Sequence, residues 1–584
     1  MKKYLSKATK SLLLMLLFVS LSLALTANKV YAMPSAPGQV LITQPDGSQF
    51  GAQSWGDESA SGVETVEGYS INLQADGWWT YSLPNQSNDG ATLSSFEGLR
   101  VAVDAPPTVE LHLERNLVLN STSPLPNSPA SDIDNLSLTT ADGAALSSNT
   151  LAASATLTQN VGTHPVLVIL GYFDDTPFKT NPAVFQSRVF GSTDSVRDYY
   201  SQASYGLLNL APASESSGSL NDGIVGWVNL GKTHPNPRNV DWNATLTIAI
   251  SAINAANPFV DYSSFDKDGN KALSASELHI VVIVAGYEAS YSATNSQPAV
   301  WGHKWSLGTP VVADGTTVGS SSVKGSYTMF GEMMGDHPST IGIIVHEMGH
   351  DLSWPDLYGA SGAGLGTWDI MAFGGWNTAA GDSYLGQTPP LPNAYLRKMN
   401  GWINPNNPAQ LVPALAYQNT PIDLSTSTSN PFALILPVDS DPSFSVGDFF
   451  IVEHREQIGY DASLPGSGAL VWHINEGAAS NSDAQNPRIK LIQADGVDHL
   501  LTAANYGDPG DAFSAASINK RFGVGTPLSS AYANGSPSDI LLVFGGGYLS
   551  GFAPMMGPQS IGVTPTQNAP QSYAFSIYLP LAQR

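Results

Sequence analysis

Two histidines four residues apart, His346 and His350, constrain this chain more than any other feature of its sequence. Residues with this spacing lie on one face of an α-helix, one turn apart, so the pattern predicts a helix. Both imidazoles then reach one metal ion, and the intervening Glu347 lies beside a metal-bound water. The segment therefore predicts a zinc site for hydrolysis, with peptide bonds as the leading target. Because so short a pattern also arises by chance, the surrounding residues must decide whether this one forms a metal site.

A catalytic zinc ion needs a third protein ligand and an open position for water. The ligand is commonly either a glutamate on a later helix or a residue six positions after the second histidine. No glutamate occurs between Glu347 and Glu453, whereas Asp356 stands six residues after His350. We therefore expect Asp356 to be the third ligand. The competing acids are Asp351, Asp369 and Asp382.

A methionine follows the expected ligands at an informative distance. Met371 lies in the segment TWDIMAFG (367–374), fifteen residues after Asp356. In metzincin proteases a methionine in a tight turn forms an apolar floor below the metal. An isolated methionine would be ordinary core, but the position of Met371 after the ligand triplet favours this turn.

Residues 346–376 resemble the immune inhibitor A-like family of secreted zinc metalloproteases. The resemblance is carried by HEMGHDLSWPDLYG (346–359), WDIMAFGGW (368–376) and MNGWINP (399–405). Other segments follow in the order that the family shows, namely QPDGSQFGAQSWGDE (44–58), EGYSINLQADGWWTYS (67–82), VILGYFDD (168–175), SVRDYYSQASYGLLNL (195–210), FDKDGN (265–270), VWGHKW (300–305), FIVEHREQIGYDASLPGSGALVWHINE (450–476) and GDPGDAF (507–513).

The resemblance implies a metzincin-like catalytic domain of the α/β (α+β) class and a zymogen with an N-terminal prosegment. Zinc would lower the pKa of its bound water, and Glu347 would carry the proton to the leaving amine. Tyr358 either supports the oxyanion or packs beside the turn. The family usually has glycine at the position of Ser353, where we expect a left-handed backbone that costs a serine about 1–2 kcal/mol.

Residues 1–32 read as a secretory signal peptide. A lysine-rich start precedes a short apolar run from Leu12 to Leu25, and Val30-Tyr31-Ala32 suits cleavage after Ala32. Removing this segment, with five lysines and no acid, changes the net charge from −24 to −29. So acidic a chain repels nucleic acid and anionic membranes. We therefore expect an extracellular protein that binds protein or peptide substrates and has no membrane span after the signal is removed.

Composition and periodicity divide the rest of the chain. We expect a β-rich prosegment over 33–115, a linker over 116–163, the catalytic domain over 164–405 and an all-β, sandwich-like region over 406–584. Within the catalytic domain, Val166–Leu170 and His279–Ala285 read as buried strands, and Ser195–Ala203 and Ala244–Ala256 as helices. The sequence has no cysteine, so disulfides and thiolate ligands are excluded.

A second metal site is expected between Asp266 and Glu277, where the spacing resembles a twelve-residue calcium loop. The expected oxygen donors are Asp266, Asp268, Asn270, the Ala272 carbonyl, Ser274 and Glu277. Lys271 stands where such loops have glycine, and no clear helix precedes the loop. The alternative is a solvated acidic turn.

Two functions remain in competition. The leading hypothesis is a secreted zinc endopeptidase made as a zymogen. The alternative is a catalytically impaired extracellular protein that binds through its β-rich C-terminal region.

Overall fold

The structure is a computed structural model of the chain. It describes residues 33–57, 61–74, 76–84, 93–108, 111–112, 160–237, 241–291, 296–359, 363–404, 406–407, 409–413, 422–423, 427–436, 447–478, 480–514, 516–523, 526–531, 533, 535, 541–546 and 575–577. The expected signal peptide and residues 116–159 of the expected linker lie outside this set. No helix among the described residues is long and apolar enough to cross a bilayer.

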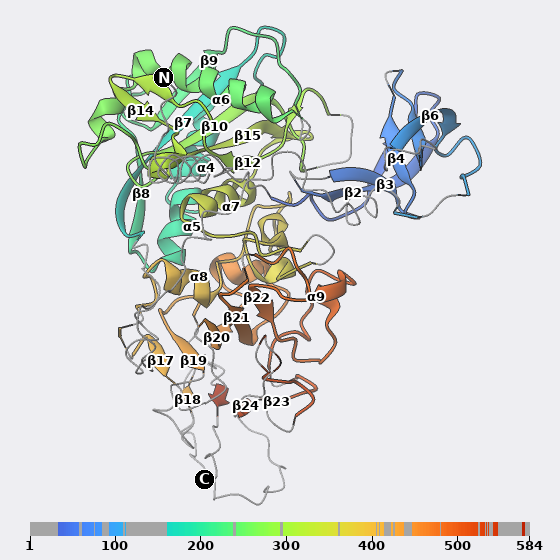
Figure 1. Ribbon diagram of the computed structural model, residues 1–584, viewed down its shortest axis with the longest axis vertical. Coiled ribbons are helices and arrows are strands. Elements are labelled where there is room, and N and C mark those ends of the chain that lie inside the picture. The colour runs from blue at the N-terminus through green and yellow to red at the C-terminus, as the bar shows by residue number, and fades with distance from the viewer. Residues whose placement is uncertain are drawn as a thin grey trace, which may run out of the picture.

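The first part of the chain is a six-stranded antiparallel sheet in which each strand pairs with the next along the chain. In Figure 1 it stands beside the main body, joined to it through its first residues. Ile42, Ala52, Ile71, Trp79 and Tyr81 form its small core. Its strands are β1 (Val40–Thr43), β2 (Gln49–Gly56), β3 (Ser61–Thr65), β4 (Ser70–Leu73), β5 (Trp79–Pro84) and β6 (Leu93–Arg100).

An eight-stranded mixed sheet forms the centre of the molecule. Its strands are β7 (Gly162–Tyr172), β8 (Leu208–Pro212), β9 (Ile224–Asn229), β10 (His279–Glu288), β11 (Ala299–Val300), β12 (His303–Trp305), β15 (Tyr327–Met334) and β16 (His337–Pro338). β10 lies parallel between β7 and β15, and β12 is antiparallel to β15. The two predicted buried strands are confirmed, because residues 166–170 of β7 and 279–285 of β10 are all buried.

Helices cover both faces of this sheet. Successive strand residues point to opposite faces, so Val168 of β7 packs with α4, α5 and α7, whereas Ile169 packs with α6. The helices are α4 (Pro182–Phe190), α5 (Val196–Ala203), α6 (Trp242–Ala256) and α7 (Ile341–Asp351). Side-chain oxygens of Asn181, Ser195 and Asp241 cap the first three, which is why those helices begin there.

Shorter elements complete this α/β part. A hairpin pairs β13 (Val311–Ala313) with β14 (Thr316–Val318). The short helices are η2 (Asn257–Phe259), η3 (Tyr262–Phe265), η4 (Ser321–Val323), η5 (Gly366–Trp368), η6 (Phe373–Trp376) and α8 (Ala394–Met399).

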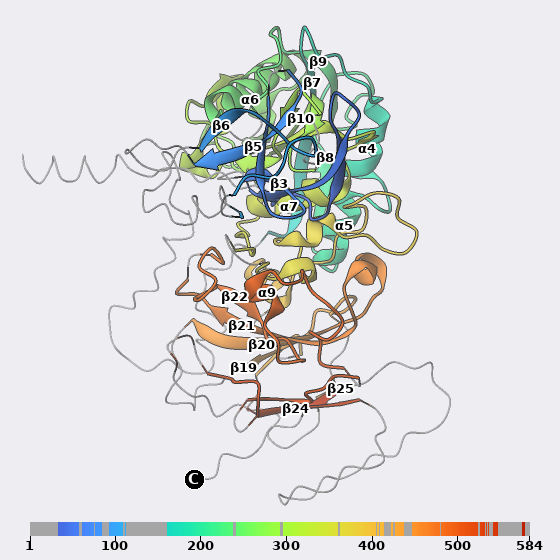
Figure 2. The same ribbon diagram turned by 90° about the vertical axis from the view of Figure 1, so that its right-hand side faces the viewer.

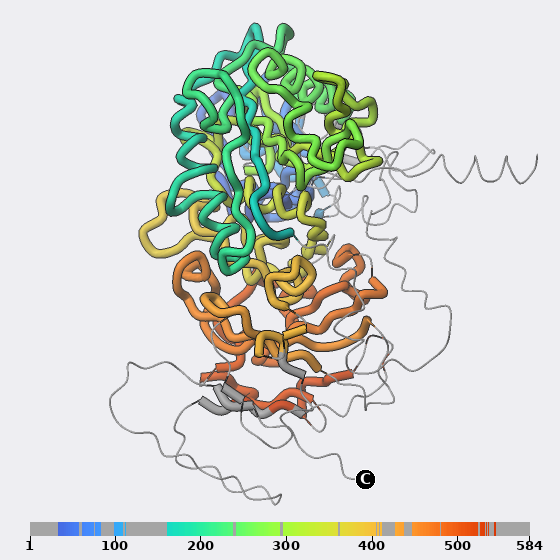
Figure 3. The backbone as a smooth tube through the Cα atoms, turned by 90° about the vertical axis from the view of Figure 1, so that its left-hand side faces the viewer, coloured from blue at the N-terminus to red at the C-terminus, as the bar shows by residue number. Residues whose placement is uncertain are grey.

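The described C-terminal part is built mainly from two sheets, which lie below the α/β part in Figures 2 and 3. One has the order β17-β19-β20-β21-β22 and the other β18-β25-β24-β23. Phe450 and Val452 of β20 pack toward the second sheet, whereas Ile451 joins the core of the α/β part. The elements are β17 (Leu411–Pro413), β18 (Ile422–Asp423), β19 (Ala433–Leu436), β20 (Asp448–Arg455), η8 (Gly459–Ser463), β21 (Gly468–Asn475), β22 (Ile489–Leu491), α9 (His499–Thr502), β23 (Arg521–Gly523), β24 (Leu541–Gly546) and β25 (Phe575–Ile577).

Candidate metal centre and active site

Helix α7 presents His346 and His350 on one face, as the spacing predicts. Their ring centroids are 5.0 Å apart, and both residues are buried. The Nδ1 of His346 donates to the Ile370 carbonyl at 2.8 Å, and that of His350 donates to the Trp354 carbonyl at 2.7 Å. Each ring is therefore a tautomer whose Nε2 carries a lone pair, the form in which histidine binds a metal ion.

Asp356 meets both histidines at one point. Its Oδ1 lies 3.3 Å from the Nε2 of His346 and 3.3 Å from the Nε2 of His350. A tetrahedral zinc ion with bonds of about 2.0–2.1 Å would hold its ligand atoms about 3.3–3.4 Å apart. The imidazoles hold the pKa of Asp356 below its usual value, although burial acts in the other direction. The three side chains thus fit one zinc ion in ligand type and spacing.

The path from the helix to Asp356 runs through a left-handed turn at Ser353. Its φ is 68°, the conformation expected at this position. The Ser353 N–H donates to His350 O at 3.0 Å, and the Trp354 N–H donates to Gly349 O at 3.1 Å. These two bonds form a Schellman motif, which ends α7 and reverses the chain. Serine therefore occupies the left-handed position of this turn, with both hydrogen bonds of the motif in place.

Met371 lies beneath the helix. A Cβ atom added to Gly349, between the two histidines, would come within 2.8 Å of the Met371 sulfur. Met371 is fully buried, and its carbonyl accepts from the Leu357 N–H at 2.7 Å. This contact ties the methionine turn to the loop that carries Asp356.

The competing acids are engaged elsewhere. Asp351 accepts from His279 Nδ1 at 3.0 Å. Asp369 accepts from the backbone N–H of Met371 at 2.8 Å and from both nitrogens of Asn393. Asp382 accepts from the Ala379 N–H at 2.8 Å. None of these three carboxylates joins Asp356 at the Nε2 atoms of His346 and His350.

Glu347 is fully buried and has an unexpected partner. Its Oε1 accepts a hydrogen bond of 2.7 Å from the backbone nitrogen of Met33. Burial, followed by the nearby Asp356 carboxylate, raises the pKa of Glu347 well above its usual value. Met33 is the residue directly after the predicted signal cleavage position.

Two tryptophans hold the same N-terminal segment. The Trp301 indole donates to the Met33 carbonyl at 3.3 Å, and the Trp376 indole donates to the Pro34 carbonyl at 2.9 Å. Sequence reasoning did not assign these residues to the site. The available signals were the place of Met33 at the predicted cleavage point and of Trp376 five residues after Met371.

Tyr358 is buried, and its ring packs edge-on to Phe373 with 6.3 Å between centroids. Packing beside the turn was one of the two roles expected for Tyr358. Its role in catalysis stays a prediction.

The expected calcium loop is an ordered turn. Carboxylate oxygens of Asp266, Asp268 and Glu277 lie within 4.8 Å of one another. Lys271 has φ 63°, so lysine adopts the left-handed conformation that usually calls for glycine. Asp266 and Glu277 also accept backbone N–H bonds from within the loop, such as Lys271 to Asp266 at 2.9 Å and Ser274 to Glu277 at 3.0 Å.

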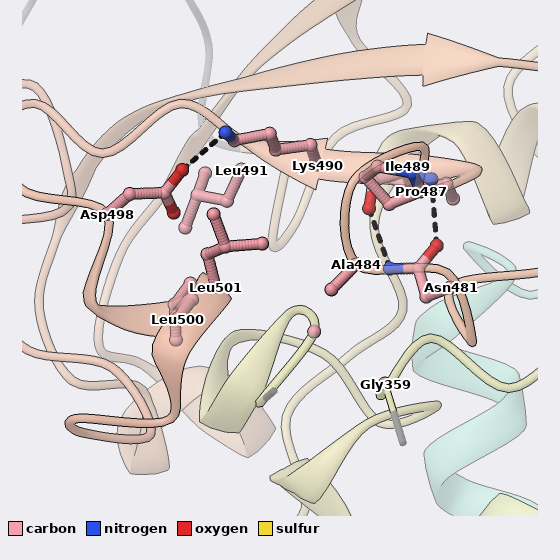
Figure 4. Close-up of a pocket in the computed structure, with 11 residues that line it drawn as sticks. Gly359, Asn481, Ala484, Pro487, Ile489, Lys490, Leu491, Asp498, Leu500 and Leu501 are labelled. Carbon is pink, nitrogen blue, oxygen red and sulfur yellow. Dashed lines mark hydrogen bonds and ion pairs between the residues drawn. The ribbon is translucent and has the colours of Figure 1, made fainter. Parts of the chain in front are cut away.

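A small pocket opens beside the loop that follows Asp356. Gly359 and Gly364 are among its lining residues, together with residues of β22 and α9. Figure 4 shows Gly359 apart from Lys490 and Leu491 of β22. Most of the lining side chains are aliphatic, and an ion pair joins Lys490 and Asp498 at its edge. The pocket thus lies between the α/β part and the C-terminal part.

Residues 190–403 match the sequence model of the immune inhibitor A peptidase M6 catalytic domain. Immune inhibitor A of Bacillus thuringiensis subsp. alesti is 26% identical over 167 residues, which are 26% of this chain and 24% of that protein. Pre-pro-metalloprotease PrtV of Vibrio cholerae (strain M66-2) is 29% identical over 113 residues, which are 18% of this chain and 12% of that protein.

The chain therefore covers about a quarter or less of the length of these relatives. The matched region includes α7, the turn at Ser353 and the methionine turn, where the quoted motifs are densest. The resemblance seen in those motifs is confirmed, because residues 190–403 match the catalytic domain of the immune inhibitor A peptidases.

Proposed function

We propose that this chain is a secreted zinc endopeptidase, made as a latent precursor, that hydrolyses peptide bonds in proteins. The observation that carries the proposal is the approach of Asp356 Oδ1 to 3.3 Å from the Nε2 atoms of both His346 and His350. His346 Nε2 and Asp356 Oδ1 make no hydrogen bond although both atoms are buried, as metal ligands would be.

The proposed mechanism assigns His346, His350 and Asp356 to the zinc ion. The ion would supply a water of lowered pKa and polarise the scissile carbonyl. Glu347 takes a proton from that water and delivers it to the leaving nitrogen. The hydrogen bond from the Met33 nitrogen to Glu347 supports this role, because it shows that a peptide nitrogen can reach the carboxylate.

The same contact supports latency. Met33 to Ala36 are buried in the active-site region, and Met33 occupies the hydrogen bond that Glu347 needs for catalysis. After cleavage behind Ala32, this segment would keep substrate out until a second cleavage released it. A zymogen with its prosegment at the N-terminus follows.

Calcium is proposed as a second, structural cation in the loop Asp266–Glu277. Three of the six expected donors are carboxylates that lie within 4.8 Å of one another. Their mutual repulsion would be relieved by a divalent ion.

A single set of measurements on the secreted protein tests the enzyme proposal. We expect about one zinc ion per chain by mass spectrometry, hydrolysis of casein after activation, and loss of hydrolysis with a chelator that added zinc restores. Glu347→Ala should keep the zinc ion and lose hydrolysis by at least about a thousandfold.

The matched control is Glu456→Gln, which removes a charge from the C-terminal part and should keep full activity. Hydrolysis retained in Glu347→Ala would overturn the mechanism. A protein that binds zinc but hydrolyses nothing after activation would instead be the impaired binding protein of the alternative hypothesis.

A further inference from the structure

The N-terminal segment Met33–Ala36 lies at the candidate active site, where Met33 bonds Glu347. Beyond the two indole bonds, the Ser35 N–H donates to Gly56 O at 2.8 Å and the Ala36 N–H donates to Ser290 O at 2.7 Å. All four residues from Met33 to Ala36 are buried, although none lies in a helix or strand. The bond to Gly56 lies within the N-terminal part, but Trp301, Trp376 and Ser290 belong to the α/β part. The α/β part therefore holds this peptide through the peptide's backbone groups, which any substrate also has.

The direction of the segment corresponds to one half of a cleaved substrate. Hydrolysis of a peptide bond leaves an amine on the residue that follows the bond, and this amine takes a proton from the general acid. The Met33 nitrogen lies 2.7 Å from Glu347, at the position of that amine. Pro34, Ser35 and Ala36 then occupy the positions of the next three residues.

The Met33 side chain is fully buried and packs closely against Gly375, and we call its site the Met33 pocket. A Cβ atom on Gly375 would lie 2.4 Å from the Met33 sulfur and 3.0 Å from its terminal methyl. Gly375 itself is fixed by the start of α7, because a Cβ on Gly342 would lie 1.9 Å from the Gly375 carbonyl oxygen. The pocket wall is therefore backbone that cannot retreat, and a slender side chain that is not branched at Cβ fits beside it best.

We propose that the Met33 pocket is the main specificity pocket of the peptidase, that it selects an unbranched or slender apolar residue directly after the scissile bond, and that Gly375 sets its depth. The proposal rests on the proposed peptidase function and adds the class of substrate. Acidic side chains are excluded, because the buried site of Met33 would desolvate a carboxylate near Glu347.

The test uses the activated, secreted protein and quenched peptides that carry X-Pro-Ser-Ala after the scissile bond, with X as Met, Leu, Ala, Asp or Lys. We expect kcat/KM for Met and Leu to exceed that for Ala by at least about tenfold and to exceed that for Asp further. Gly375→Ala should reverse the order of Met and Ala, since its methyl group occupies the place of the thioether. Gly308→Ala, at an open position with nothing within 4 Å, is the control and should keep the wild-type order.

A second measurement needs no variant and covers the case in which Gly375→Ala does not fold. The free peptides Met-Pro-Ser-Ala, Leu-Pro-Ser-Ala and Asp-Pro-Ser-Ala are compared as inhibitors of casein hydrolysis by the wild-type protein. The Met and Leu peptides should inhibit at concentrations at least about tenfold lower than the Asp peptide.

The two proposals fail in different ways. Activity on casein with equal rates for all five X residues, or equal inhibition by the three peptides, would overturn the pocket and leave the peptidase standing. Retention of the wild-type preference by a folded Gly375→Ala would also overturn it. Absence of zinc-dependent hydrolysis of casein and of every peptide would overturn the proposed function itself.

Discussion

Ser353 shows how one residue can depart from a pattern while the geometry is kept. A side chain at φ 68° clashes with its own backbone, and glycine avoids this. The Schellman bonds on either side hold Ser353 in place nevertheless, with donor–acceptor distances of 3.0 and 3.1 Å. The departure from glycine is therefore expected to reduce stability without moving Asp356.

Ser353→Gly is expected to stabilise the protein by about 0.5–1 kcal/mol. The gain of about 1–2 kcal/mol from removing the strain is partly offset by the larger backbone entropy of glycine in the unfolded chain. Urea unfolding measures the change. Ser251→Gly, inside α6, is the matched control and should destabilise by about 0.5–1 kcal/mol. Destabilisation by both variants would show that the turn at Ser353 is not strained.

At the scale of elements, the predictions that depended on local pattern agree with the structure. The continuous apolar runs lie in β7 and β10, and the two histidines lie on α7. These elements could be predicted because burial on both faces of a strand and helical periodicity each leave a pattern in residues that are close in the sequence. Asp356 was expected by excluding glutamates over a short range. Trp301 and Trp376 were missed because the partner they bind, the Met33 segment, is 268 and 342 residues away along the chain.

The central sheet contains a pH-sensitive element at the start of β12. His303 is fully buried, donates from Nδ1 to the Trp301 carbonyl at 2.7 Å and accepts at Nε2 from the Tyr327 hydroxyl at 3.2 Å. Burial lowers its pKa from 6.5 to about 4, so it is neutral in the folded protein at pH values where the unfolded chain is protonated. Its contribution is complete above pH 6.5 and is lost as pH falls from 6.5 toward 4.

His303→Gln should remove this dependence, since glutamine can donate to the carbonyl and accept from the hydroxyl but does not titrate. The wild type should lose about 3 kcal/mol more of its unfolding free energy than the variant between pH 7 and pH 4. Urea unfolding at several pH values checks this. Parallel curves for the two proteins would mean that His303 does not carry the effect.

The acidic loop before β10 should respond to calcium as a unit. We expect calcium to raise the melting temperature by several degrees and Asp266→Ala to abolish the rise, because Asp266 would supply the first oxygen ligand of the loop. Asp336→Ala, at an exposed acid outside the loop, should keep it. An unchanged melting temperature in the wild type would assign the loop to a solvated acidic turn.

At the scale of the whole molecule, one core joins the α/β part to the C-terminal sheets. Trp354 and Trp368, near the candidate metal centre, share this core with Ile451, Leu470 and Trp472 of β20 and β21. No sequence pattern predicts such packing, because the apolar sequence of a strand indicates that the strand is buried but not which element it packs against. The sequence therefore predicted a β-rich C-terminal region and did not predict that one of its sheets supports the loops of the active site.

A buried ion pair fixes this junction. Arg455 bonds both carboxylate oxygens of Asp461, and neither side chain is exposed. The pair also bonds both backbone groups of Leu391, which lies just before α8. Arg455 donates to the Leu391 carbonyl and Asp461 accepts from the Leu391 N–H, each at 2.9 Å. These bonds position the chain that leads from the methionine turn into α8.

Asp461→Ala should destabilise the protein by about 3–5 kcal/mol, because it removes the carboxylate that bonds the buried Arg455 at two nitrogens and leaves it with Glu453, whose carboxylate lies 3.5 Å from its Nη1. We expect a single unfolding transition at lower urea concentration, since one core spans both parts. The double variant Asp461→Leu with Arg455→Met should recover much of the loss by replacing two charges with apolar groups of similar size. Two separate transitions in Asp461→Ala would show instead that the pair couples two independently stable units, and a double variant as unstable as the single one would assign the loss to packing at Leu391.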